Sequence, residues 1–177
     1  MRLFIAINFD EKSKNAIQQI SDEVKKHCKQ GRFVKSQHLH LTLEFLGNVP
    51  STQVEKVKSA MDQVKEEKFT IKLSEIGFFR GRDGHIYWIG IEENKTLLDL
   101  QKRLHKALEN QGFILENRLY KPHITIGRRV KVKDTFLPEK LSSEIKQVEV
   151  DVDKIDLMKS EHVNGELVYS IEYTRRF

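Results

Sequence analysis

Two short stretches, His40-Leu41-Thr42-Leu43 and His123-Ile124-Thr125-Ile126, repeat one pattern in which histidine and threonine alternate with aliphatic residues. They begin 123 − 40 = 83 positions apart, close to half of the 177-residue chain. Residues i and i+2 lie on the same face of a strand, so each stretch is predicted to be a strand with its aliphatic side chains in the core. If a pseudo-two-fold axis relates the two halves, both His–Thr pairs face one cavity.

Such a cavity suits displacement at phosphorus, which needs a base for the attacking water and an acid for the leaving oxygen. Histidine, with an ordinary pKa of about 6.5, can take either part near neutral pH. Two hydroxyls can hold the non-bridging phosphate oxygens, and a cation can offset their charge. The pattern therefore predicts His40 and His123 as an acid–base pair and Thr42 and Thr125 as substrate-binding residues, with no metal and no cofactor.

Other interpretations of the first motif remain open. His38 and His40 share a strand face by alternation and are typical of half a zinc site, but no further ligand motif accompanies them. A single His-x-Thr pair is also common as a structural feature of half-buried strands, whereas two copies in similar apolar settings favour function. Glu44 follows Thr42 on the same face, and we expect it to help keep His40 charged.

Composition narrows the class of protein. Lys and Arg number 31 and Asp and Glu 26, so the net charge of +5 suits an anionic partner such as nucleic acid or phosphate. Cys28 is the only cysteine, which excludes an intrachain disulfide and a cysteine zinc cluster. No apolar run approaches the roughly 20 residues that cross a bilayer, and Met1–Asn8 lacks the features of a signal peptide. We expect one cytoplasmic domain over residues 1–177.

Local patterns predict an α+β chain with antiparallel sheets. Strands are expected over Leu3–Phe9, Leu39–Leu46, Phe69–Phe79, His85–Ile91, Pro122–Val130, Ile145–Met158 and Leu167–Tyr173. Helices are expected over Asp10–Lys29, from a capping box at Ser51 to about Lys65, and from Asn94 to Gly112. Residues 131–144 are expected to form a polar connection.

The segments His40–Gly47 and Tyr120–Arg128 resemble the paired H-x-T-x motifs of the two-histidine phosphoesterase superfamily. They are most similar to its bacterial and archaeal RNA 2′,3′-cyclic phosphodiesterases, historically called 2′-5′ RNA ligases. The likeness continues through Arg2–Ile7 and Ile86–Gly90 and spans nearly the whole chain. It implies duplicated β-α-β-α-β halves that form two antiparallel-sheet, pseudo-symmetric lobes around a central cleft.

The resemblance also implies individual roles. His40 would be the general acid, or proton donor, and His123 the general base, or proton acceptor. An arginine five residues after the second histidine corresponds to Arg128, which would bind the substrate. Strict alternation would instead place Arg129 on the face of His123, unless Gly127 hosts a bulge. We therefore expect Arg128 in the site, with Arg129 as the alternative.

The leading hypothesis is a metal-independent enzyme that hydrolyses a 2′,3′-cyclic phosphate at an RNA end to a 2′-phosphomonoester. The same site could act on another cyclic phosphate or on a 2′-5′ linked nucleotide, including reversible 2′-5′ RNA ligation. A non-catalytic nucleotide- or RNA-binding module is the alternative from another class, and such a module needs no acid–base pair. The expected partners are RNA ends or cyclic nucleotides as substrates, with no membrane and no protein partner, and we expect a monomer.

Overall fold

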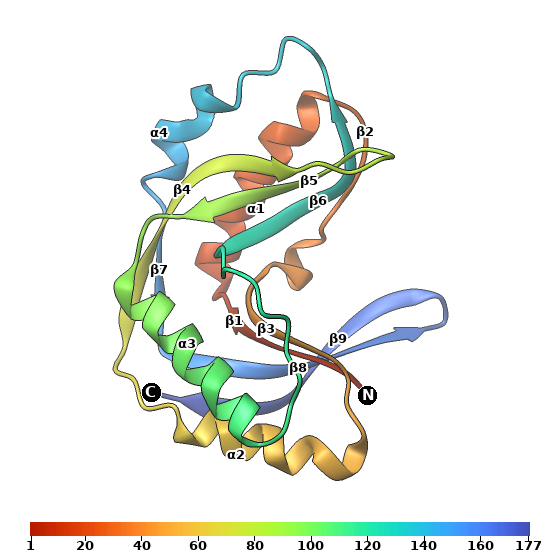
Figure 1. Ribbon diagram of the computed structural model, residues 1–177. Coiled ribbons are helices and arrows are strands. Elements are labelled where there is room, and N and C mark those ends of the chain that lie inside the picture. The colour runs from red at the N-terminus through yellow and green to blue at the C-terminus, as the bar shows by residue number, and fades with distance from the viewer.

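The structure is a computed structural model that describes residues 1–177. Its framework is two antiparallel β-sheets (Figure 1). The four-stranded sheet has, in spatial order, β3 (His40–Asn48), β1 (Arg2–Asn8), β8 (Lys154–Val163) and β9 (Glu166–Arg176). The five-stranded sheet has β2 (Cys28–Phe33), β6 (His123–Val132), β5 (His85–Ile91), β4 (Phe69–Phe79) and β7 (Glu149–Val152). The predicted α+β class with two antiparallel sheets is confirmed.

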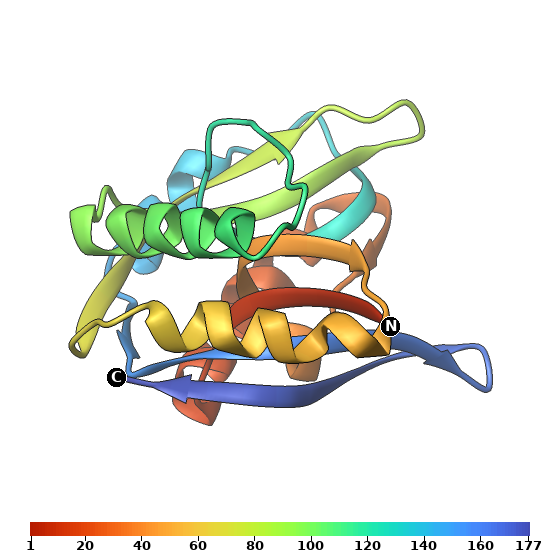
Figure 2. The same cartoon turned by 60° about the horizontal axis from the view of Figure 1, so that its bottom comes forward.

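Four α-helices pack outside these sheets. They are α1 (Glu11–Lys26), α2 (Val54–Gln63), α3 (Lys95–Asn110) and the single turn α4 (Ser142–Ile145). Three short 3₁₀ segments complete the chain, η1 (Ser36–His38), η2 (Ser51–Gln53) and η3 (Pro138–Leu141). Figure 2 shows α2 and α3 lying side by side. None of these helices combines the length and apolar character needed to cross a membrane.

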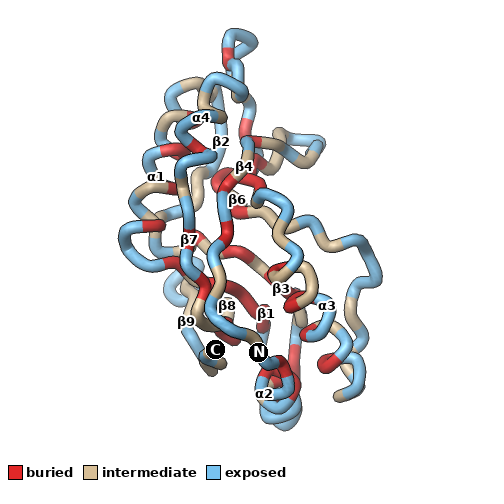
Figure 3. The backbone as a smooth tube through the Cα atoms, turned by 90° about the vertical axis from the view of Figure 1, so that its left-hand side faces the viewer, coloured by how far each residue is buried: buried red, intermediate tan, exposed pale blue.

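Side-chain caps and apolar stripes explain the long helices. The carboxylate of Asp10 accepts a hydrogen bond from the Ser13 amide at the start of α1, at 2.8 Å, and Asn94 does the same for the Leu97 amide of α3, at 2.9 Å. The apolar stripe of α3 that faces inward is buried. Its members are Leu97, Leu100, Leu104, Ala107 and Leu108. Figure 3 shows such buried residues lining the strands and the inward faces of the helices.

The internal repeat extends beyond the two tetrapeptides. In one sheet β3 pairs with β1, and His40 lies opposite Asn8. In the other β6 pairs with β5, and His123 lies opposite Gly90. In both cases the partner strand comes earlier in the chain and is followed directly by a long helix, α1 or α3. Each histidine therefore begins a strand held by an equivalent neighbour.

Several expected boundaries were wrong. The first helix ends at Lys26 rather than Lys29, and strand β2, which pairs with β6, follows it. Four of the six residues of β2 are exposed, so no alternation marked it in the sequence. The helix α2 has Gln53 at its N-cap without a side-chain hydrogen bond, so Ser51 begins a 3₁₀ turn and not a capping box.

The C-terminal third also differs from the expectation. Ile145–Met158, expected to be one strand, includes β7 and the start of β8, which belong to different sheets. The break at Asp153 lets the chain pass from the five-stranded sheet to the four-stranded sheet. The connection expected over 131–144 begins after Val132 and contains η3 and the start of α4. A continuous alternation of valines cannot reveal that two halves of a segment enter different sheets.

Candidate active site

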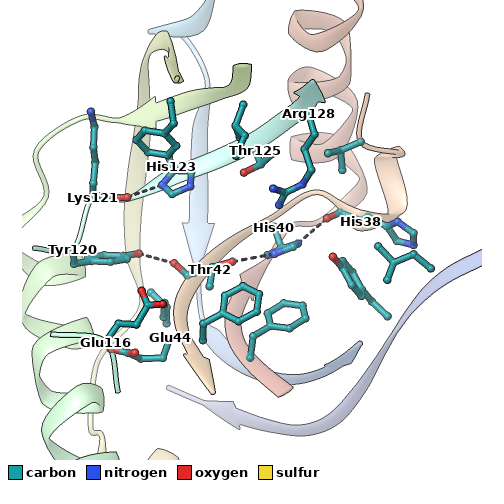
Figure 4. Close-up of a pocket in the computed structure, with 18 of the residues that line it drawn as sticks. His38, His40, Thr42, Glu44, Glu116, Tyr120, Lys121, His123, Thr125 and Arg128 are labelled. Atoms are coloured by element: carbon teal, nitrogen blue, oxygen red, sulfur yellow. Dashed lines mark hydrogen bonds between the residues drawn. The ribbon is translucent and has the colours of Figure 1, made fainter. Parts of the chain in front are cut away.

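One pocket of about 800 Å³ is lined by residues from both sheets and holds all five residues predicted for the site. These are His40, Thr42, His123, Thr125 and Arg128 (Figure 4). The intervening aliphatic residues of both motifs are at most 2% exposed. The predicted alternation, with polar side chains in a cavity and aliphatic ones in the core, is confirmed.

The two motif strands run in opposite directions across this pocket. Figure 4 shows His40 and His123 at opposite corners, with Thr42 and Thr125 between them. Arg128 extends over the side of the pocket that holds His40. A group bound at the centre would therefore have one imidazole on each side and a hydroxyl from each strand.

Both imidazoles are oriented by the main chain in the same way. Nδ1 of His40 lies 2.7 Å from the carbonyl oxygen of His38, and Nδ1 of His123 lies 2.7 Å from that of Lys121. A carbonyl only accepts hydrogen bonds, so each Nδ1 carries the proton of the neutral ring. Nε2 is thus the nitrogen left for a substrate, and Nε2 of His40 also lies 3.1 Å from the hydroxyl of Thr42.

Aromatic rings pack edge-on against both histidines. The ring of Tyr169 is T-shaped to that of His40, at 5.6 Å between centroids, and Phe79 is T-shaped to His123 at 5.0 Å. Phe4 and Trp88 lie on further sides of the two imidazoles, respectively. These contacts cover part of each ring and restrict its orientation.

Burial makes both histidines weak bases. It lowers the pKa of His40 to about 4, although the carbonyl of His38 opposes the shift. Burial also lowers the pKa of His123, and the nearby cations of Arg118 and Lys121 act in the same direction. At neutral pH both imidazoles are therefore uncharged before an anion binds.

A β-bulge decides which arginine enters the pocket. Thr125 lies opposite Trp88, but Gly127 lies opposite Tyr87, so β6 carries one extra residue at Ile126. The bulge expected at Gly127 thus occurs one position earlier. Its effect is the expected one, since Arg128 lines the pocket and Arg129 does not.

Arg129 itself has an unusual backbone. Its φ of 53° lies in the left-handed region, which residues with a Cβ rarely adopt. A second register shift separates Tyr87 from His85, which lies opposite Val130. The local chain is therefore distorted on both sides of Arg128.

Glu44 does not act as expected, and His38 does not share a strand face with His40. The carboxylate of Glu44 accepts hydrogen bonds from Gln101 Nε2 and His105 Nδ1, each at 2.6 Å, and does not contact His40. The expectation that Glu44 keeps His40 charged was therefore wrong. His38 lies in η1 and not on the strand of His40, and no cluster of three or more His, Cys, Asp or Glu side chains is arranged to hold a metal ion.

Sequence reasoning missed the residues that support the site from elsewhere in the chain. The hydroxyl of Tyr120 donates to the carbonyl oxygen of Thr42 at 2.9 Å and so ties the loop before β6 to β3. Burial raises the pKa of the Tyr120 phenol, which keeps it a donor. His105 of α3 contacts the buried Glu44. No local pattern marks either residue, because their partners lie 78 and 61 positions away.

The comparisons with known proteins agree on one family. A model of the 2′-5′ RNA ligase superfamily matches residues 6–164. The RNA 2′,3′-cyclic phosphodiesterase of Methanothermobacter thermautotrophicus is 30% identical over 96% of this chain and 95% of its own length. The protein of that name from Geobacillus stearothermophilus is 33% identical over 79% of this chain, and the match spans only 46% of that relative. The crystal structure of E. coli LigT complexed with 3′-AMP has a TM-score of 0.81 at 25% identity, covering 99% of this chain and 97% of that one.

Proposed function

Because this chain belongs to the 2′-5′ RNA ligase superfamily, we propose that it hydrolyses 2′,3′-cyclic phosphodiester ends of RNA to 2′-phosphomonoesters. The resemblance drawn from the paired motifs is confirmed by that membership. The observation that carries the proposal is the convergence of both His–Thr pairs on one pocket, each with Nε2 free of the main chain. The names of the relatives support the choice of RNA, and the 3′-AMP bound to E. coli LigT is in keeping with a nucleotide phosphate as ligand.

The substrate phosphate would sit between the two motif strands. The hydroxyls of Thr42 and Thr125 donate to its non-bridging oxygens, and the guanidinium of Arg128 offsets its negative charge. The same charge acts on His40. A phosphate anion beside a buried imidazole favours the protonated ring. Substrate binding therefore raises the low pKa of His40 and allows it to be protonated.

Hydrolysis then needs one proton transfer on each side of phosphorus. Nε2 of His123 accepts a proton from water as the water oxygen attacks phosphorus. The bond between phosphorus and O3′ breaks, and O3′ takes the proton from Nε2 of His40. One water has been added and the phosphate remains on O2′. The acid, the base and the neutralising charge all come from side chains, so the mechanism uses no metal.

Two other activities use the same pocket. A 2′-5′ linked nucleotide presents a phosphodiester to the same groups, and the reverse reaction would ligate RNA through a 2′-5′ bond. A binding module without catalysis is the other candidate, but it does not account for two imidazoles with matching tautomers. The cytoplasmic location and the monomeric state stay predictions.

Product analysis tests the proposal. The wild-type protein is incubated in EDTA with 2′,3′-cyclic nucleotides, with short RNAs that end in a cyclic phosphate and with 2′-5′ linked dinucleotides, and the products are assigned by ³¹P NMR. We expect 2′-phosphates from the cyclic substrates, and loss of most turnover in His40→Ala and His123→Ala. Activity that requires zinc or magnesium, or 3′-phosphate products, would overturn the mechanism. Binding without turnover would favour the non-catalytic module.

A further inference from the structure

A buried carboxylate forms part of the pocket wall at one end. Glu44 lies two residues beyond Thr42 on β3, lines the pocket and is only 8% exposed. Its Oε1 accepts both the Gln101 and the His105 hydrogen bonds. Its Oε2 has no hydrogen-bond partner within the protein and keeps some accessible surface, in a side chain that lines the pocket.

Gln101 adds a second acceptor beside it. A carboxylate can only accept, so the amide group of Gln101 must turn its NH₂ toward Glu44, which directs its own oxygen elsewhere. That oxygen also has no protein partner, and Gln101 is likewise 8% exposed and lines the pocket. Two acceptors in a largely desolvated wall are stabilised when a ligand donates to them.

The charged groups of the pocket indicate which part of a nucleotide can lie beside Glu44. Arg128 and Glu44 both line the pocket, and Glu116, which also lines it, is paired with Arg118 at 3.0 Å. Figure 4 shows both carboxylates on the side of Thr42 that is away from His40 and Arg128. A phosphate group only accepts hydrogen bonds, so it binds at Arg128 but not at the unpartnered oxygen of Glu44, which also only accepts. The uncharged nucleobase is therefore the part that can occupy the end at Glu44.

We propose that Glu44 and Gln101 bind the Watson–Crick edge of the terminal nucleobase and favour guanine. Guanine alone among the four bases presents two adjacent donors there, N1–H and the N2 amino group. Adenine, cytosine and uracil each place an acceptor next to their single donor, and that acceptor would face the carboxylate. Glu44 lies two residues beyond Thr42 along β3 with a bulge between them, so the separation is at most about 7 Å, the order of distance by which a base extends from its own cyclic phosphate.

This inference rests on the proposed function for its substrate, but it can be tested apart from it. The first measurement is kcat/KM of the wild-type protein with the 2′,3′-cyclic phosphates of guanosine, inosine, adenosine, cytidine and uridine. We expect guanosine to exceed the last three by on the order of 10- to 100-fold, as for hydrogen bonds to a charged group. Inosine, which keeps N1–H but lacks the amino group, should fall between. Equal values for all five would overturn the proposal without any variant.

Two variants separate recognition from structure. Glu44→Gln should reduce kcat/KM for guanosine on the order of 10-fold or more and leave the other three bases within a few-fold. Glu109→Gln is the matched control, because its carboxylate lies 3.7 Å from Nε2 of the same His105 but does not line the pocket. It should keep the guanine preference. A uniform loss for all bases in Glu44→Gln would show that Glu44 holds a sugar hydroxyl or only joins α3 to β3.

A binding measurement distinguishes failure of this inference from failure of the proposed function. Calorimetric titration with the four nucleoside 3′-monophosphates needs no turnover. Tighter binding of 3′-GMP without hydrolysis of any cyclic nucleotide would retain the base site and refute the proposed function. Hydrolysis of the cyclic phosphates with equal binding of all four monophosphates would retain the proposed function and refute the base site.

Discussion

His40 and His123 are held in the same way, each by a 2.7 Å hydrogen bond from Nδ1 to the main-chain carbonyl oxygen of the residue two positions earlier. The bond fixes the same tautomer in both rings and leaves both Nε2 atoms for chemistry. It also arises twice at the same place, the first residue of a strand, β3 or β6. The duplication therefore preserves the orientation of the reactive nitrogen as well as the residue type.

Arg128 and Arg129 offer a matched pair of substitutions. Arg128→Ala should lower kcat/KM on the order of 10- to 100-fold, because a charge-assisted bond to the phosphate is lost. Arg129→Ala should change kcat/KM little, because Arg129 does not line the pocket. Alanine also has a Cβ, so the backbone strain at the φ of 53° is the same in the variant as in the wild type. Steady-state kinetics on a 2′,3′-cyclic nucleotide measures both. A larger loss from Arg129→Ala would show that the bulge at Ile126 does not select Arg128 for the substrate.

The threonine hydroxyls are tested by two substitutions at each position. Thr42→Ala or Thr125→Ala should reduce turnover on the order of 10- to 100-fold, and Thr→Ser should retain much more of it. The reason is that serine keeps the donor and loses only a methyl group. Thermal unfolding of each variant controls for stability. If serine and alanine cause equal losses, the methyl group matters for packing and the hydroxyl does not bind phosphate.

The pH dependence of stability reports the burial of His40. The pKa of His40 is about 4 in the folded protein, against 6.5 for the unperturbed side chain. Between these values the unfolded chain binds a proton that the folded protein does not, so stability falls as pH is lowered from 6.5 toward 4. The loss from this one group should approach about 3 kcal/mol. Urea denaturation at several pH values should show a smaller loss in His40→Gln, and an identical loss would contradict the burial of this imidazole.

The pH dependence of catalysis follows from the same shifts. The mechanism needs one protonated and one neutral histidine, so the plot of kcat/KM against pH should be bell-shaped. Its two limbs should report the macroscopic pKa values of the pair in the free enzyme. Burial lowers the pKa of both residues, which places the maximum below pH 6.5. Initial rates at low substrate concentration across the acid and neutral range give this profile. A maximum well above pH 7 would mean that other groups carry the protons.

Much of the site could be predicted because its pattern is local. Alternation over four residues was enough to place His40, Thr42, His123 and Thr125 on the pocket side of their strands. The choice of Arg128 needed a bulge, which one extra residue creates and which alternation cannot locate.

The parts that could not be predicted depend on contacts between distant segments. Glu44 meets His105 and Gln101 because α3 packs beside β3, and the sequence separations are 61 and 57 residues. The strand β2 is largely exposed, so no apolar period distinguished it from a loop. In both cases the tertiary packing, and not the local sequence, determines the structure.

The central claim is that His40 gives a proton to the leaving oxygen and His123 takes one from water. It is tested most directly by comparing His40→Ala and His123→Ala on a nucleoside 2′,3′-cyclic phosphate and on a 3′-deoxynucleoside 2′-(4-nitrophenyl phosphate), whose leaving group needs no proton and which has no 3′-hydroxyl to displace it. Acid–base assistance contributes on the order of 10²- to 10⁴-fold, so both variants should lose most activity on the cyclic substrate. On the nitrophenyl ester, His40→Ala should recover far more activity than His123→Ala. Equal recovery, or recovery of His123→Ala alone, would contradict this division of roles.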